Sequence, residues 1–545
     1  MKKINDYRVN LFMKKVFTFT MAVIGMLFLS MVSCTETADQ ADSQNKTDGK
    51  MGDTDVGIKT EVGIWYCPYY FTSPYDLWEM PYGSGIPAAQ YKPLCSDAPG
   101  DFRKYDAADP EVIDFHLRQI ADAKIDFLLF ELSPGGLGGY REDGGWNMNS
   151  IANAREVCKR IKIWNDDEQN KWKLKYAVCG GCHGDVWGND PDFPPALCME
   201  DTARDVFDSF YSNPEYGGPD NYYHLNGQPL LVFWGYSDSI SNHWANYDGD
   251  KTYGNRFALR PAAGCQAGEY GWNISQSGTV IHSEVEVVSP GWGHYSRAEP
   301  PYVYRRNGDF YKECWEKVLR HPPPQIVMIA SFNDYWENCA VWTADTANLT
   351  DADKWQDHSG ELNPSMYWDM TKYYIGKMRS EFADSKKKLK ELSLMVPGSG
   401  ALSALQLTPH GTKGGAKFTA DFTVTDVVVT CPNWGNDDSD MIFYLYRWDT
   451  DYETTLASEP VWVDSKTGIG YRDNGNIEFE IDDGVAPAGT YLWILEGINS
   501  TPGFWIESEA ELGDDPDAVF FYKGKVINEY IRSRVCGCTL EGNNS

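Results

Sequence analysis

Short apolar segments alternate with amphipathic segments from about Glu61 to Ser385. The run Ile326–Ala330 is continuously apolar, which is typical of a strand buried on both faces of a parallel sheet. We predict seven strands in this region, at residues 62–70, 125–132, 174–179, 229–234, 257–262, 285–289 and 325–332.

Helices are predicted between these strands. Asp109 is a suitable N-cap before Pro110, and Ile113, Leu117 and Ile120 form an apolar stripe. His116 lies beside this stripe, which indicates a core histidine rather than a catalytic one. Further helices are expected at residues 152–164, 202–211, 309–320 and 364–382. The alternation predicts an α/β domain over residues 61–390, and its length favours a (β/α)8-type barrel.

The pattern changes after Lys390. Gly, Asn, Asp and Pro separate short strand-like segments at residues 417–424, 441–448, 477–481, 490–496, 504–507 and 518–522. This spacing predicts a C-terminal antiparallel β-sandwich over residues 400–545, a candidate carbohydrate-binding or scaffold module.

The N-terminus has the pattern of an export signal. Lys14 and Lys15 precede an apolar run from Val16 to Val32, and Cys34 follows a serine. We predict a lipoprotein signal peptide over residues 1–34 with lipidation of Cys34, and a polar, disordered tether over residues 35–60. A transmembrane anchor is the alternative, but no basic stop-transfer cluster follows the run. The predicted location is therefore outside the cytoplasm, anchored by lipid on the periplasmic face or at the cell surface.

The net charge of −31 argues against nucleic acid as a partner, because nucleic-acid binding needs basic patches. A neutral oligo- or polysaccharide is compatible with this charge. Aromatic residues make up 14% of the chain, and aromatic rings stack on sugar faces. Cys179-Gly-Gly-Cys182-His183 matches a c-type haem attachment pattern, but it ends a predicted strand where a haem would have no pocket. His183 with Asp185 is the nearest approach to a metal motif, and no cofactor or metal is predicted.

In (β/α) barrels, the catalytic residues lie at the C-terminal ends of the strands. Reading each predicted strand to its end gives candidate substrate-binding residues: Trp65, Tyr66, Tyr69, Glu131, His183, Trp234, Tyr236, Arg260, Trp292, His294, Arg297 and Asn333. Asp334 and Glu337 follow the seventh strand, three residues apart. Glycosidic cleavage needs an acid and a base, so these two residues are the catalytic candidates. The alternative for such a pair is helix capping or a solvated surface.

The segment Ser331-Phe-Asn-Asp-Tyr-Trp-Glu337 resembles the Ser-Phe-Asn-Glu-Trp-His-Glu signature of glycoside hydrolase family 99, the endo-α-mannosidases and endo-α-mannanases. It also resembles related bacterial sequences labelled as polysaccharide-biosynthesis proteins. Other segments are similar to the family in the same order: Tyr105 to His116, Tyr222 to Val232, and Ser289-Pro-Gly-Trp292 followed by Arg297 and Tyr311. The resemblance covers residues 61 to 380 and none of the predicted sandwich.

The resemblance implies a retaining mechanism. Asp334 would act as a base on the sugar 2-hydroxyl, which attacks the anomeric carbon to give an epoxide-like intermediate. Glu337 would protonate the leaving group and later activate water. The chain departs from the family at two positions: Asp334 replaces a glutamate, shortening the reach by roughly 1.5 Å, and Trp342 replaces a further glutamate. These departures leave the sugar and the linkage open.

We therefore expect an exported glycoside hydrolase. The alternative is a non-catalytic, cell-surface glycan-binding lipoprotein on a hydrolase-like barrel. A biosynthetic role in polysaccharide assembly is disfavoured, because export separates the protein from nucleotide sugars.

Overall fold

The computed structural model describes residues 59–70, 104–133, 137, 146–181, 195–234, 244, 247–262, 272, 279–293, 303–346, 355–383, 385–396, 402–407, 412–434, 439–466, 475–498, 502–508 and 510–540. Several predicted features lie outside these residues, namely the signal segment with Cys34, the tether up to residue 58, and His183, Tyr236, His294 and Arg297. Within the described residues, no helix is both long enough and apolar enough to cross a membrane.

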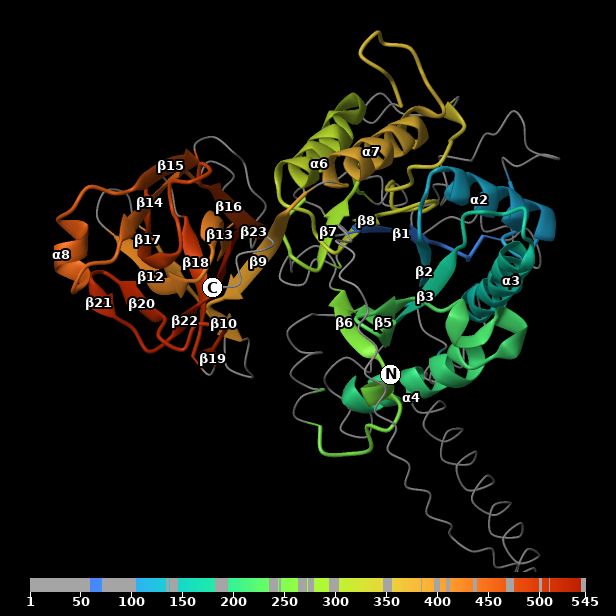
Figure 1. Ribbon diagram of the computed structural model, residues 1–545, viewed down its shortest axis with the longest axis horizontal. Coiled ribbons are helices and arrows are strands. Elements are labelled where there is room, and N and C mark those ends of the chain that lie inside the picture. The colour runs from blue at the N-terminus through green and yellow to red at the C-terminus, as the bar shows by residue number, and fades with distance from the viewer. Residues whose placement is uncertain are drawn as a thin grey trace, which may run out of the picture. The chain divides into compact units, whose positions relative to one another are not determined.

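The first region contains a curled, mostly parallel sheet (Figure 1). Its parallel strands follow the order β6-β5-β3-β2-β1-β8-β7. Their bounds are β1 Glu61–Tyr66, β2 Phe127–Glu131, β3 Lys175–Gly181, β5 Gln228–Trp234, β6 Ala258–Ala262, β7 Val285–Val288 and β8 Ile326–Ile329. The short β4 (His224–Leu225) pairs antiparallel with β5.

The seven predicted strands match these seven parallel strands, whereas closure into a (β/α)8-type barrel is not shown by the described residues. Among the described residues, no ladder joins β6 to β7, so the sheet forms a half-barrel. The physical reason is that closure requires hydrogen bonds between the two edge strands, and apolar patterning carries no information about that pairing.

Helices connect the strands. They are α2 (Pro110–Asp122), α3 (Trp146–Asp166), α4 (Pro195–Val206), α6 (Asp309–Arg320) and α7 (Met366–Phe382), with short helices η1 (Phe207–Tyr211), η2 (Pro214–Tyr216), η3 (Gly218–Asp220), η4 (Gly254–Arg256) and η6 (Arg306–Gly308). Asp109 caps α2 as predicted, since its side chain accepts a hydrogen bond from the amide of Glu111. Figure 1 shows α2 and α3 beside β2 and β3, and α6 and α7 beside β7 and β8.

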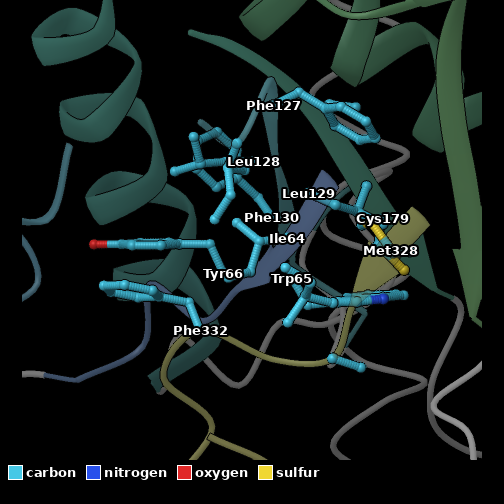
Figure 2. Packing of buried hydrophobic residues seen from close by; sticks show 14 of the residues in the cluster. Ile64, Trp65, Tyr66, Phe127, Leu128, Leu129, Phe130, Cys179, Met328 and Phe332 are labelled. Carbon is cyan, nitrogen blue, oxygen red and sulfur yellow. The ribbon is translucent and has the colours of Figure 1, made fainter. Parts of the chain in front are cut away.

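Side chains along β1 alternate between the inner face of the curled sheet and the face covered by helices. A Cβ added to Gly63 would lie 2.4 Å from Phe127 and 2.6 Å from Met328, so the inner face is closely packed there. Trp65 shares this inner face. Figure 2 shows Tyr66 and Phe332 together on the opposite side, pointing away from Trp65.

The second region is antiparallel. It contains a six-stranded sheet in the order β15-β14-β17-β12-β20-β21, a four-stranded sheet β16-β13-β23-β9, and the smaller sheets β11-β18-β22 and β10-β19. The elements are β9 Lys387–Ser393, β10 Met395–Val396, β11 Leu402–Gln406, β12 Lys413–Ala420, β13 Thr423–Cys431, β14 Met441–Arg447, α8 Tyr452–Leu456, β15 Trp462–Lys466, β16 Gly475–Glu480, β17 Gly489–Gly497, β18 Gly503–Glu507, β19 Glu511–Leu512, β20 Val519–Tyr522, β21 Lys525–Val526, β22 Tyr530–Ile531 and β23 Ser533–Leu540.

This region has a hydrophobic cluster of its own, which includes Phe418, Phe443, Phe479 and Trp493. Strand β9 pairs with β23, so the antiparallel region starts near Lys387 rather than at residue 400. The polar lysine-rich sequence of β9 concealed this strand, because only Leu389 among its residues is fully buried.

Polar groups connect the two regions. The ammonium of Lys317 lies 2.5 Å from Glu478, and Arg320 pairs with Glu480 at 2.7 Å. The amide of Ser283 donates to the carboxylate of Glu391 at 3.0 Å.

The described residues include both disulfide-bonded and free cysteines. Cys198 is disulfide-bonded. Cys536 and Cys538 are free.

Candidate functional site

The loop after β8 is anchored to the end of β1 by Asn333. Its side chain accepts from the amide of Cys67 at 2.8 Å and donates to the carbonyl of Cys67 at 2.9 Å and to the hydroxyl of Tyr105 at 2.9 Å. Asn333 is fully buried. The side chain of Asn333 therefore has a positioning role, because it ties the segment that carries Asp334 and Glu337 to the C-terminal end of β1.

Asp334 takes part in the turn that leads to Glu337. Its amide donates to the hydroxyl of Ser331 at 2.8 Å, and its Oδ1 accepts from the amide of Glu337 at 3.1 Å. Its carbonyl accepts from the amides of Cys339 and Ala340. Only 5% of Asp334 is exposed, so this carboxyl group is buried within its own turn.

Glu337 is held by the loop that follows β7. The indole nitrogen of Trp292 donates to Oε2 of Glu337 at 2.9 Å, and the amide of Gly293 donates to the carbonyl of Glu337 at 2.9 Å. Glu337 is partly exposed, unlike Asp334. The predicted residues Trp292, Asp334 and Glu337 therefore lie together at the C-terminal ends of β7 and β8.

Glu131 brings a third carboxyl group to this end of the sheet. It is the last residue of β2, and its Oε1 accepts from the amide of Ser133 at 2.9 Å and from the hydroxyl of the same residue. Phe130 pairs with Tyr66 in the β1–β2 ladder, so Glu131 lies level with Cys67, the residue that Asn333 holds.

The charge of Glu337 acts on the other two carboxyl groups. Burial raises the pKa of Glu131 to about 7, and the charge of Glu337 adds to this shift. Burial also raises the pKa of Asp334 well above its ordinary value, with further contributions from the charges of Glu337 and Glu131. Clusters of carboxyl groups with displaced pKa values are typical of acid–base sites.

An aromatic cluster supports the loop from the helix-covered side. Phe332 stacks on Tyr66 at 5.7 Å and on Trp342 at 5.0 Å between ring centroids. His116 of α2 contacts this cluster, and its Nδ1 is hydrogen-bonded to the hydroxyl of Tyr66 at 2.9 Å. Burial lowers the pKa of His116 to about 3, so it is a neutral core histidine as predicted.

Tyr66 consequently differs from its expected place among the substrate-binding residues. Strand alternation sends consecutive side chains to opposite faces, and Tyr66 follows the inward-facing Trp65. Its hydroxyl is hydrogen-bonded to His116 of α2 instead of pointing to the carboxyl groups, and Figure 2 shows its ring directed away from Trp65.

The other substrate-binding candidates among the described residues lie either in aromatic pairs or in an ion pair. Trp65 and Trp234 form an edge-to-face pair with centroids 6.3 Å apart, and Tyr69 stacks on Trp336 at 4.9 Å. The guanidinium of Arg260 makes a bidentate contact with Glu284 at 2.6 and 2.7 Å. Because Glu284 directly precedes β7, Arg260 is engaged toward the opposite end of the strands.

Sequence reasoning missed Arg305 as a supporting residue. This fully buried guanidinium donates to the side chain and carbonyl of Asn338 and to the carbonyl of Ala340, so it fixes the chain after Glu337. The sequence signal for this role of Arg305 was weak, because an arginine between Tyr304 and Arg306 is typical of a surface position.

One group of described residues brings metal-ligand atoms within 4.8 Å of one another, namely His321, Asp426 and Glu478. It lies where α6 meets β13 and β16, away from the carboxyl groups at the strand ends. His321 contacts Glu286 at 3.5 Å and Glu478 at 3.3 Å, and Lys317 also pairs with Glu478. The protein's own cations therefore balance these carboxylates, which indicates an ion-pair cluster.

Comparisons with known proteins give structural neighbours. The chain is similar to a family 99 endo-α-mannosidase from Bacteroides thetaiotaomicron in complex with bis-tris-propane, with 15% identity over 60% of this chain and 100% of that chain and a TM-score of 0.41. A second structure of the same kind of enzyme from that organism gives 14% identity, 59% and 99% coverage, and a TM-score of 0.39. Both neighbours are glycoside hydrolases.

A protein described as glycoside hydrolase-like gives 14% identity, 62% and 97% coverage, and a TM-score of 0.36. No family model and no curated protein sequence matches this chain.

Proposed function

We propose that this protein hydrolyses glycosidic bonds in an oligo- or polysaccharide, with Glu337 as its acid–base carboxyl group. The observation that carries the proposal is the placement of Glu337: it is partly exposed, it is fixed by Trp292, and its charge raises the pKa of the carboxyl groups of Glu131 and Asp334 at the same end of the sheet. Hydrolysis of a glycoside needs such an acid beside a base.

In this proposal, Glu337 gives a proton to the leaving oxygen while the bond to the anomeric carbon breaks. It then takes a proton from the water that completes hydrolysis. The indole of Trp292 fixes one oxygen of Glu337, which restricts the direction of proton transfer. The motif resemblance supports retention of the anomeric configuration, and Trp65, Tyr69, Trp234 and Trp336 are proposed as sugar-stacking residues.

The test is Glu337→Gln, which keeps the shape of the side chain and removes its proton transfer. We expect hydrolysis of a glycan panel to fall about 10² to 10⁴-fold while glycan binding persists. Glu168→Gln in the exposed turn after α3 is the matched control and should leave hydrolysis unchanged. A Glu337→Gln variant as active as the wild type would refute the assigned role.

A glycan-binding protein without catalysis is the second candidate. The burial of Asp334 within its turn favours it, because a family base would have to reach the substrate. Calorimetric binding of a glycan by the wild type, with no products in that same mixture, would establish this candidate instead.

We also propose export and lipid anchoring through Cys34, supported by the basic, apolar and small-residue pattern that precedes it. Cys34→Ala should move the protein from the membrane fraction to the soluble fraction after cell lysis, without changing its melting temperature. Membrane association that survives in this variant would contradict the anchor. The antiparallel C-terminal region is proposed as a carbohydrate-binding or scaffold module.

A further inference from the structure

We infer that Glu131, rather than Asp334, is the base that works with Glu337, and that Asp334 positions Glu337. This inference rests on the proposed hydrolase function. It assigns the second reacting group to a different strand from the one that the sequence motif indicates.

The carboxyl group of Asp334 is engaged within its own turn. Its Oδ1 accepts from the amide of Glu337 at 3.1 Å, and the amide of Asp334 itself donates to the hydroxyl of Ser331 at 2.8 Å. With 5% exposure, the group lies beneath the turn that it stabilises. An aspartate carries its carboxyl group one methylene closer to the backbone than a glutamate, so this short side chain stays in local hydrogen bonds.

Glu131, the last residue of β2, lies on the face of the sheet that a substrate would contact. Phe127, Leu129 and Glu131 share one face of β2, because alternate residues of a strand point the same way. Phe127 contacts the inner position of Gly63, so Glu131 also lies on the inner face of the curled sheet, at its C-terminal end. The side chain is partly exposed, and Ser133 holds one of its oxygens.

The two carboxyl groups come from strands on opposite sides of β1. Strand β2 flanks β1 on one side and β8 flanks it on the other. Glu131 lies level with Cys67, and Asn333 binds Cys67 from the β8 side. The carboxyl groups of Glu131 and Glu337 therefore approach the end of β1 from two strands, and a sugar could lie between them.

The electrostatics agree with this geometry. The titratable groups that interact with Glu131 are Cys67 just after β1, Cys179 of β3, and Asp334 and Glu337 after β8. Burial and the charge of Glu337 raise the pKa of Glu131 to about 7, which suits a base that works near neutral pH. The pKa of the more deeply buried Asp334 is raised well above its usual range, which favours a protonated group that cannot accept a proton.

The carboxylate of Glu131 takes the proton from the hydroxyl, of water or of the sugar itself, whose oxygen forms a bond to the anomeric carbon. The bond from that carbon to the leaving oxygen breaks with its electron pair on the oxygen, which takes the proton of Glu337. An attacking sugar hydroxyl requires a second step with water and gives retention, whereas direct attack by water gives inversion.

The test compares two amide variants on a glycan that the wild type hydrolyses. Glu131→Gln should lower kcat about 10² to 10⁴-fold with little change in KM, because Gln can still accept from Ser133. Asp334→Asn should lower kcat less than about tenfold, because its carbonyl oxygen can still accept from the amide of Glu337. Wild-type kcat/KM should rise with pH through about 7, and Glu131→Gln should lose this limb.

Formate provides a readout that a structural role would not give. It should restore part of the activity of Glu131→Ala by replacing the missing carboxylate, and it should not restore Asp334→Ala. Near-wild-type activity in Glu131→Gln, or a larger loss in Asp334→Asn, would overturn this inference and leave the hydrolase proposal standing. Absence of hydrolysis by the wild type across the glycan panel would refute both.

Discussion

Asp334 and Glu337 are three residues apart, yet their carboxyl groups have different surroundings. Asp334 is buried and hydrogen-bonded within its own turn, whereas Glu337 is partly exposed and accepts the indole hydrogen of Trp292. Burial without a compensating cation favours the protonated form of a carboxyl group. The surroundings of each residue therefore decide its chemical role. The hydrogen bond from Trp292 to Glu337 can be removed by a single substitution.

Trp292→Phe keeps an aromatic ring and removes the hydrogen bond to Glu337. We expect kcat to fall about tenfold with KM nearly unchanged, because the bond fixes the orientation of a reacting group. Steady-state kinetics check this expectation. Trp164→Phe on α3 is the matched control, since it removes an indole hydrogen bond to the carbonyl of Trp172, and it should leave kcat unchanged. Equal losses in both variants would indicate a general effect of indole removal.

At the scale of elements, the site depends on how the loop after β8 is joined to β1. Asn333 satisfies both backbone groups of Cys67, and the aromatic rings of Phe332 and Trp342 pack against Tyr66 on the other face. The loop is thus fixed on two sides of one strand. Phe332 and Asn333, which the chain shares with the family signature, therefore have structural roles in packing and hydrogen bonding that do not depend on catalysis.

Asn333→Ala should lower the free energy of unfolding by roughly 3 kcal/mol, because it leaves the amide and carbonyl of Cys67 buried without their partner. Urea unfolding of the purified variant measures this change. Asn255→Ala at an exposed position in η4 is the control, with an expected change below about 0.5 kcal/mol. A loss as small as that of the control would show that Cys67 finds other partners.

At the scale of the whole molecule, buried ionisable groups join the parallel region to the antiparallel region. Lys317 and His321 of the first region meet Glu478 and Asp426 of the second. Burial, reinforced by the charge of Glu478, raises the pKa of Asp426 to about 7, even though the cations oppose this shift. The junction should therefore respond to pH in the neutral range.

A carboxyl group whose pKa is higher in the folded state than in the unfolded state contributes stability at low pH. This contribution is lost as the pH rises from the unfolded value of about 3.9 through about 7. Asp426→Asn keeps a neutral group that can accept the bond from Thr425, so its melting temperature should exceed that of the wild type increasingly between pH 4 and pH 8. Scanning calorimetry across this range checks the trend.

The exposed Asp421→Asn provides the comparison for this series and should show no such trend. A constant difference between Asp426→Asn and the wild type at every pH would mean that Asp426 stays ionised in the folded protein.

The sequence determined those features that depend on local chemistry. The bounds of α6 agree with its prediction, because a full amphipathic repeat defines it from Asp309 to Arg320. The cap of α2, the core role of His116 and the burial of β8 also follow from neighbouring residues. The placement of Asp334 and Glu337 after a buried strand was readable for the same reason.

Only the tertiary structure decided which distant residues meet. The sheet was predicted to close, but closure depends on pairing between edge strands and not on their apolar patterns. Tyr66 was expected beside the carboxyl groups, and the phase of strand alternation turned it toward α2. Glu131 lies more than two hundred residues before Glu337 in the chain, so only the β2–β1–β8 order could bring their charges together. A sequence pattern records the surroundings of one segment, whereas a site is assembled by the register between segments.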